Sequence, residues 1–290
     1  MKIAWSIDPF DKNDQLIQNA DILVRSLKAD HVEVVYIAAP SETGLSLAFE
    51  VPEPERFSGY PLMLIEQKLK QFNVRYDTIK ILKVQSTSKN EQVEEYSKYL
   101  KENNFDFVVL ATHARTGIER FFQGSFSEAM ILNAKTNLII FNPKDKVSPK
   151  INKVLFAHDL SKIATRNLQK IDEFAKQINA DVEVDYVSEP ILNYSETSAM
   201  LYAKNYRTIV DEKIEFLKAE IKDVNPNIKV YVEDTWDSIS DLIIKRSEKN
   251  NSDMIIVNSK VGSLVAAMGG SISRQVVRHA HHPVMVLVGN

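Results

Sequence analysis

The hydrophobic pattern alternates between two kinds of segment along the whole chain. Short, nearly continuous apolar runs predict buried β-strands, and longer segments with apolar residues three and four positions apart predict amphipathic helices. In one such segment, Leu16, Ala20, Leu23 and Leu27 fall on a single helical face. Strands that alternate with helices are typical of a parallel β-sheet with helices on both faces.

The predicted elements form two similar series. The first series has strands at 2–7, 32–38, 78–82, 107–111 and 138–141, and helices at 16–27, 61–72, 90–102 and 125–133. The second series has strands at 153–157, 182–187, 229–232, 254–257 and 284–288, and helices at 164–178, 199–222, 238–249 and 271–278. Each series therefore predicts an α/β unit.

Four landmarks recur in the sequence at offsets of 146 to 151 residues. Residues 3–8 resemble 154–159, 35–40 resemble 185–190, 106–110 resemble 253–257, and 124–127 resemble 270–273. A nearly constant offset predicts two copies of one domain, at 1–143 and 151–290. The polar segment between them, 144–150, predicts a linker.

Composition and charge exclude several classes of function. The 290 residues are 44% hydrophobic and 26% charged, which is ordinary for a folded protein. The absence of cysteine excludes disulfides, thiolate zinc sites and cysteine nucleophiles. The net charge of −3 argues against nucleic-acid binding. No apolar run reaches the roughly 20 residues of a membrane helix, and we expect a cytoplasmic protein with no membrane partner.

Glycine is scarce and concentrated in two segments. Five of the eight glycines follow the fourth predicted strand of a copy: Gly117, Gly124, Gly262, Gly269 and Gly270. Ligands of doubly wound sheets bind beyond the carboxyl ends of strands, where the strand order reverses. Backbone freedom there fits a ligand site, and a tight strand-to-helix turn explains it equally well.

An aspartate follows the first strand of each copy, Asp8 in one and Asp159 in the other. A carboxylate at this place can accept hydrogen bonds from a ribose hydroxyl or a purine amine. An Asx turn or a helix N-cap is the alternative role, and the sequence leaves both open.

The helices that follow the glycines begin differently in the two copies. Ser125 and Glu128 fit a capping box in the first copy. The second copy has Arg274 at the acidic position, although a cation in the first turn opposes the helix dipole. Together with Lys260 it indicates an anion site, and a solvated surface arginine is the alternative.

These landmarks together resemble the universal stress protein family in its tandem two-domain form. The resemblance covers nearly the whole chain and rests on Asp8, Asp159, Tyr36-Ile37, Tyr186-Val187, residues 113–117, Gly124-Ser125, Gly270-Ser271 and residues 282–286. It implies two Rossmann-like domains, each a five-stranded parallel sheet of order 3-2-1-4-5 with helices on both faces. It also implies that the two fifth strands pair within the chain as an intrachain pseudo-dimer. A homodimer of tandem chains stays open.

The resemblance further implies a nucleotide site in the first copy. ATP-binding members carry glycine, two residues, glycine, nine residues, then glycine and serine or threonine. Ala111 and Ala114 replace the first two glycines here, and Val257 and Lys260 replace them in the second copy. The implied first-copy site comprises Asp8, Ile37, Ala111, His113, Ala114, Arg115, Gly124, Ser125, Phe126 and Ser127, with Arg115 as a phosphate partner.

The second copy offers a candidate site for an anion. Its residues are Asp159, Val187, Val257, Lys260, Gly270, Ser271, Ser273 and Arg274.

The sequence contains no Walker A motif, no Rossmann glycine fingerprint and no nucleophile elbow. We therefore assign no catalytic and no metal-ligating residues. We expect a non-enzymatic stress-response module that binds ATP or another adenine nucleotide, with or without Mg²⁺. The alternatives are a scaffold or interaction protein with degenerate sites that bind no nucleotide, and a slow ATP hydrolase.

Overall fold

The computed structural model describes residues 1–38, 59–112, 126–188, 197–235, 237–259 and 272–288; of residues 128 and 197–206, it describes the backbone alone. The chain divides into two compact units. The first contains Met1–Lys150 and Ser259–Asn290, and the second contains Ile151–Asn258. In the described part of the chain, no helix is both long enough and apolar enough to cross a membrane.

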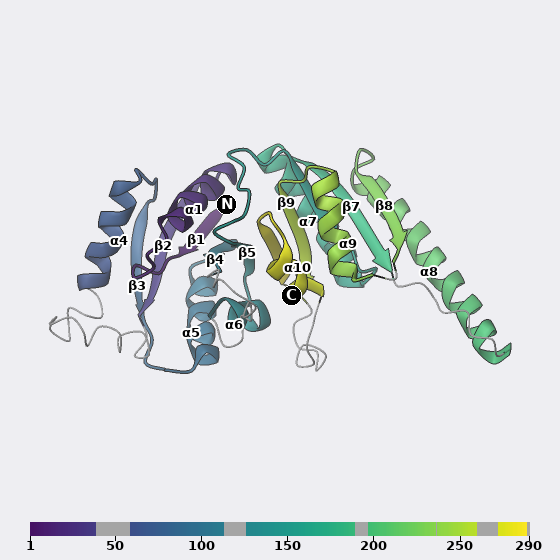
Figure 1. The fold of residues 1–290 in the computed structure, drawn as a ribbon, viewed down its shortest axis with the longest axis horizontal. Coiled ribbons are helices and arrows are strands. Elements are labelled where there is room, and N and C mark those ends of the chain that lie inside the picture. The colour runs from purple at the N-terminus through teal and green to yellow at the C-terminus, as the bar shows by residue number, and fades with distance from the viewer. Residues whose placement is uncertain (39–58, 113–125, 189–196, 236, 260–271, 289–290) are drawn as a thin grey trace. The chain divides into compact units, whose positions relative to one another are not determined.

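The first unit contains a sheet of order β3-β2-β1-β4-β5-β10 (Figure 1). Its strands are β1 Lys2–Ser6, β2 His31–Ala38, β3 Thr78–Lys83, β4 Phe107–Ala111, β5 Asn137–Phe141 and β10 Val284–Val288. The first five strands are parallel, which confirms the predicted order 3-2-1-4-5 for the first copy.

The fifth strands of the two copies pair within this unit. β10 runs antiparallel to β5, with Val284 opposite Ile140 and Val286 opposite Leu138. This register confirms the pairing that we expected between the two fifth strands. It also covers an apolar strand edge, which would otherwise be a template for aggregation.

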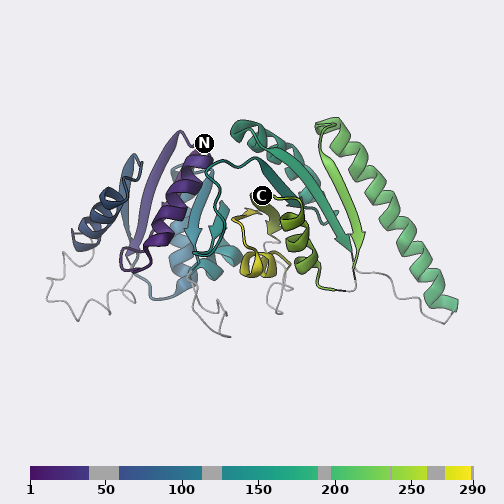
Figure 2. The same cartoon turned by 45° about the horizontal axis from the view of Figure 1, so that its top comes forward.

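The helices of the first unit are α1 Asp14–Ser26, α4 Gly59–Gln71, α5 Lys89–Glu102, α6 Phe126–Asn133 and α10 Ile272–His279. Asn13 is the N-cap of α1, and its side chain accepts a hydrogen bond from the N–H of Gln15. Figure 2 shows α1 lying along the strands, where the predicted apolar face is buried. Right-handed crossovers place α1 and α4 on one face of the sheet and α5 and α6 on the other.

The second unit repeats the arrangement of the first. Its strands are β6 Lys153–Ala157, β7 Asp181–Ser188, β8 Lys229–Asp234 and β9 Met254–Ser259, and its helices are α7 Lys162–Ile178, α8 Thr197–Val224 and α9 Ile239–Lys249. The order β9-β6-β7-β8 is parallel throughout and corresponds to β4-β1-β2-β3 of the first unit. Tyr186 of β7 packs with Val210 and Ile214 of α8.

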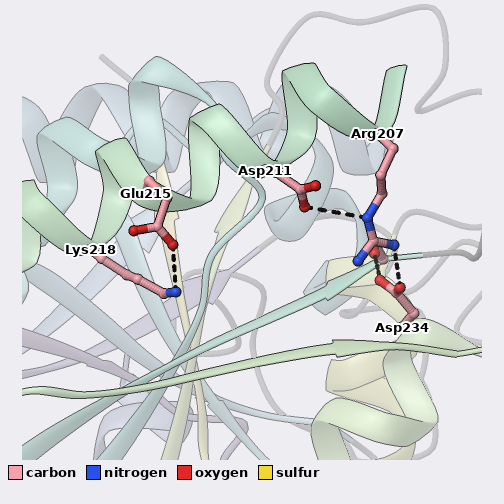
Figure 3. A network of polar contacts seen from close by, with 6 residues as sticks. Arg207, Asp211, Glu215, Lys218 and Asp234 are labelled. Carbon is pink, nitrogen blue, oxygen red and sulfur yellow. Dashed lines mark hydrogen bonds and ion pairs between the residues drawn. The ribbon is translucent and has the colours of Figure 1, made fainter. Parts of the chain in front are cut away.

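An arginine of α8 forms an ion pair with an aspartate of the strand β8. Figure 3 shows the guanidinium of Arg207 between two carboxylates, with Nε 3.3 Å from Oδ1 of Asp211 and Nη1 2.6 Å from Oδ2 of Asp234. Hydrogen bonds from Ser188 and Arg207 lower the pKa of Asp234. The Glu215–Lys218 pair further along α8 is exposed, so its contribution to stability is small.

The duplication extends to individual side chains at the amino ends of the strands. The N–H of Lys2 donates to Oδ2 of Asp106 at 2.7 Å, and the N–H of Lys153 donates to Oδ2 of Asp253 at 3.1 Å. In each case an aspartate that precedes the fourth strand of a copy holds the start of its first strand.

The two copies differ in a buried ion pair. Asp185 of β7 occupies the place of Val35 of β2, and Asp185 is 1% exposed. Its Oδ1 lies 3.8 Å from Nε of Arg246 on α9, and neither of its carboxylate oxygens accepts a hydrogen bond from described residues. Arg246 also pairs with Glu233 and lies 4.8 Å over the ring of Tyr231. Burial raises the pKa of Asp185 to about 6, against the opposing charge of Arg246.

Replacing the buried carboxyl by the apolar residue of the first copy should change the pH dependence of stability. Because the pKa of Asp185 is raised to about 6, the native state loses stability as pH rises through that value. The effect of Asp185→Val on the free energy of unfolding should therefore be more favourable at about pH 8 than at about pH 5, by about 1 kcal/mol, because valine does not titrate. Urea unfolding followed by circular dichroism measures both values.

Asp181→Asn is the matched control, because Asp181 is an exposed aspartate at the start of the same strand. It should leave the pH dependence unchanged. A gain of equal size at both pH values for Asp185→Val would contradict the assigned ionisation.

Candidate functional site

The strand order of the first unit reverses at β1. Trp5 of β1 is opposite Val34 of β2 on one side and Val109 of β4 on the other. The chain leaves β1 for α1 and leaves β4 for α6, and these helices lie on opposite faces of the sheet. The carboxyl ends of β1 and β4 therefore meet at the kind of position where doubly wound sheets bind ligands.

Asp8 follows β1 and is exposed. The N–H of Phe10 donates to its Oδ1 at 2.9 Å, and the N–H of Asp11 donates to its main-chain oxygen at 3.3 Å. These contacts form an Asx turn, one of the two roles that the sequence allowed. No hydrogen bond joins Oδ2 to a described residue, so one carboxylate oxygen fixes the turn and the other is accessible to a ligand.

The start of α6 is fastened to the end of β4. Ser127 is 8% exposed, and its hydroxyl donates to the main-chain oxygen of Ala111 at 3.0 Å. The ring of Phe126, the first residue of α6, packs against Tyr96 with 6.1 Å between centroids. Ile37 is buried in β2. Four of the predicted first-copy residues besides Asp8 therefore have a defined place around these strand ends.

At the two substituted glycine positions that the structure describes, the backbone does not adopt a left-handed conformation. The described non-glycine residues with positive φ are Lys28, Asn73, Asn104, Leu160, Asn179 and Asn251. Ala111 and Val257 are not among them, so neither residue carries the cost of a left-handed conformation. A change from glycine at these two positions is compatible with the local fold.

Several predicted residues lie outside the described part of the chain. In the first copy these are His113, Ala114, Arg115, Gly124 and Ser125, and in the second copy they are Lys260, Gly270 and Ser271. The remaining second-copy residues divide between the two units. Asp159, Val187 and Val257 belong to the second unit, and Ser273 and Arg274 of α10 belong to the first.

The second unit repeats the aspartate turn. Asp159 is exposed, and the N–H of Ser161 donates to its Oδ1 at 3.1 Å. Ser161 is the N-cap of α7, where its hydroxyl oxygen accepts the N–H of Ala164 at 3.1 Å. Val187 and Val257 are buried in β7 and β9. Both copies thus use the same carboxylate turn to enter their first helix.

His158 distinguishes the second copy from the first, which has Ile7 at the same place. It is 4% exposed, and its Nδ1 accepts the N–H of Leu160 at 3.0 Å. Burial lowers the pKa of His158 to about 4, against the charge of Asp159. The imidazole is therefore neutral at physiological pH with its proton on Nε2, and its ring lies edge-on to Phe156. These contacts assign it a structural role in the turn.

The structure adds three residues to the carboxyl edge of the first unit that the sequence analysis missed. Thr112 follows β4, and its hydroxyl donates to Oδ1 of Asn142, which follows β5. The N–H of Asn142 donates to Oδ2 of Asp145 at 2.8 Å. Their polar character directly after two predicted strands was the available signal. The sequence analysis placed Asp145 in the linker and did not single out Thr112.

A parallel sheet with this order, and the same aspartate turn after the first strand of each copy, define a tandem Rossmann-like α/β protein. The pattern of the universal stress protein family matches residues 1–142 and 150–287. The chain therefore belongs to the universal stress protein family.

Solved structures with the same fold cover nearly the whole chain. A universal stress protein from Archaeoglobus fulgidus DSM 4304 is 20% identical, with 100% of this chain and 96% of that chain covered and a TM-score of 0.68. A functionally unknown protein from Pseudomonas aeruginosa PAO1 is 12% identical, with 99% and 92% covered and a TM-score of 0.61. No curated protein matches the chain.

Replacing His158 by the isoleucine of the first copy should alter the response to acid. A histidine whose pKa is lowered from 6.5 to about 4 costs the native state stability as pH falls through this range. His158→Ile should cost about 1 kcal/mol at about pH 8, because the N–H of Leu160 loses its acceptor. At about pH 5 this deficit should shrink or reverse, as urea midpoints at both pH values will report.

His279→Gln, at an exposed position of α10, serves as the histidine control and should behave like the wild type at both pH values. A His158→Ile deficit that is the same at both pH values would refute the neutral, buried state of His158.

Proposed function

We propose that this chain is a non-enzymatic stress-response module that binds an adenine nucleotide at the carboxyl edge of the first unit. The observation that carries the proposal is the Asp8 carboxylate, fixed through Oδ1 and accessible through Oδ2, beside the strand end that anchors α6. Oδ2 would accept hydrogen bonds from the ribose hydroxyls. The start of α6 would present main-chain N–H groups and the positive end of its dipole to phosphates.

Family membership supports this proposal, because the family resemblance drawn from the sequence includes ATP-binding members with this arrangement. The geometry at Ala111 supports it as well, since an alanine with negative φ fits at a position where those members carry glycine. We place the nucleotide in the first unit because the second copy has the bulkier, β-branched Val257 at that position. The anion site of the second copy stays a prediction.

We propose binding rather than catalysis. Within the described ranges, histidine, aspartate and glutamate side chains form no group of three or more that could hold a metal ion. Mg²⁺ would accordingly enter on the phosphate groups of the nucleotide.

Removing the Asp8 carboxylate should weaken nucleotide binding. Asp8→Ala should reduce the affinity of the full chain for ATP with Mg²⁺ by about tenfold or more, the value of one charge-assisted hydrogen bond. Asp159→Ala is the matched control, because it removes the equivalent carboxylate of the second copy. It should leave this affinity within about twofold, as measured by isothermal titration calorimetry.

Two results would overturn this proposal in different ways. The absence of binding heat with ATP, ADP and AMP would favour the scaffold alternative. Phosphate release from ATP above the buffer background, abolished in Asp8→Ala, would show an enzyme instead.

A further inference from the structure

A chain of buried hydrogen bonds joins the end of β4 to the segment after β5. Thr112 is fully buried, and its N–H donates to the main-chain oxygen of Phe141 at 2.9 Å. Its hydroxyl donates to Oδ1 of Asn142, and the N–H of Asn142 donates to Oδ2 of Asp145 at 2.8 Å. The N–H of Asp145 returns to the oxygen of Asn142 at 3.1 Å, which closes a tight turn.

The same segment is bonded to two other elements of the first unit. The side-chain amide of Asn19 on α1 donates to the main-chain oxygen of Pro143 at 3.2 Å. The N–H of Lys146 donates to the main-chain oxygen of His281, shortly before β10, at 2.9 Å. Main-chain atoms of the segment after β5 are thus hydrogen-bonded to a helix of the first copy and to the residues before β10 of the second.

Asp145 is the titratable group of this turn. It is 8% exposed, and burial raises its pKa to about 7, while hydrogen bonds from the backbone and side chain of Asn142 oppose the shift. The charged residues beside it in the segment, Lys144 and Lys146, are exposed. His281 approaches from the side of β10 through its main-chain oxygen.

Protonation of Asp145 favours the closed turn. The cost of burying the ionised carboxylate exceeds the strength of its hydrogen bonds with Asn142, so the turn holds the neutral carboxyl more tightly. Ionisation of Asp145 therefore loosens the turn, and with it the position of the Asn142 Oδ1 atom that accepts the Thr112 hydroxyl. Thr112 adjoins Ala111, whose main-chain oxygen anchors Ser127 at the start of α6.

We propose that Thr112, Asn142 and Asp145 form a latch that positions the carboxyl end of β4, so that nucleotide affinity in the first unit depends on the protonated Asp145 carboxyl. This inference rests on the proposed function, since it concerns the regulation of the same site. The three residues are positioning residues, and the ligand touches other groups. The latch loosens as pH rises through about 7 and tightens as pH falls.

The test compares nucleotide affinity of the full chain at about pH 6 and about pH 8 for the wild type and Asp145→Asn. Asparagine keeps the size and an acceptor oxygen but does not titrate. The wild type should bind ATP with Mg²⁺ about fivefold more weakly than Asp145→Asn at about pH 8, and equally at about pH 6. The protonation of the nucleotide itself is common to both proteins and cancels in this ratio.

A pair of variants at Thr112 tests the other end of the latch. Thr112→Val removes the hydroxyl and should give the weaker affinity at both pH values. Thr112→Ser keeps the hydroxyl and should restore both the affinity and its pH dependence. A wild-type to Asp145→Asn ratio that is the same at both pH values, or a Thr112→Val variant that binds like the wild type, overturns the latch while the nucleotide proposal stands.

Hydrogen exchange in the free protein separates the two proposals if no nucleotide binds. The protection factor of the Thr112 amide should fall between about pH 6 and about pH 8 in the wild type and stay constant in Asp145→Asn. Protection that changes without any nucleotide binding overturns the role in affinity and leaves a structural latch. Protection that is identical in both proteins overturns the latch altogether.

Discussion

The candidate site depends on one constraint, the parallel pairing of β1 with two neighbours whose following helices lie on opposite faces of the sheet. The register of Trp5 against Val34 and Val109 fixes where β1 and β4 end. Asp8 and Ala111 then follow from the chain path, because each stands at the carboxyl end of its strand. The Asx turn and the Ser127 hydrogen bond add orientation to a position that the strand order already determines.

The strands β6, β7, β8 and β9 of the second copy repeat the backbone arrangement of the first copy. Some of the buried side chains differ between the copies. Asp185 and His158 take the places of Val35 and Ile7, and both are buried. Their pKa shifts have the same cause, desolvation, and opposite signs for stability. As pH falls from about 6 towards about 4, protonation of Asp185 favours the native state of the second unit. Over the same range, the buried neutral His158 increasingly disfavours it. The two shifts therefore act on the stability of the second unit in opposite directions over this range.

Most of the fold could be predicted because its signals are local. Apolar runs located the strands, helical periodicity located the helices, and the nearly constant offset located the repeat. The Thr112–Asn142 contact joins residues that are 30 positions apart, and no periodicity reports it. A polar segment that contains Pro143 has the same pattern whether it is solvated or packed, which is why Asp145 was assigned to a linker. For Asp8 the sequence allowed two roles, and the Phe10 hydrogen bond shows that Oδ1 takes part in the turn. Comparison of the two repeats shows that Asp185 replaces Val35. The contacts of Arg246 with Asp185 and Tyr231, which only the structure gives, explain how a carboxyl is accommodated there.

The position of the linker bears on how binding could be signalled. A flexible connection would isolate the two copies, whereas here the segment after β5 contacts α1 through Pro143 and the approach to β10 through Lys146. β5 itself lies between β4 and β10 in one sheet. The end of β4 is therefore connected to a strand of the second copy through main-chain hydrogen bonds across β5. Asp145 is the titratable residue of the turn that follows β5. The proposed latch therefore makes the junction between the copies sensitive to the same protonation that positions the site.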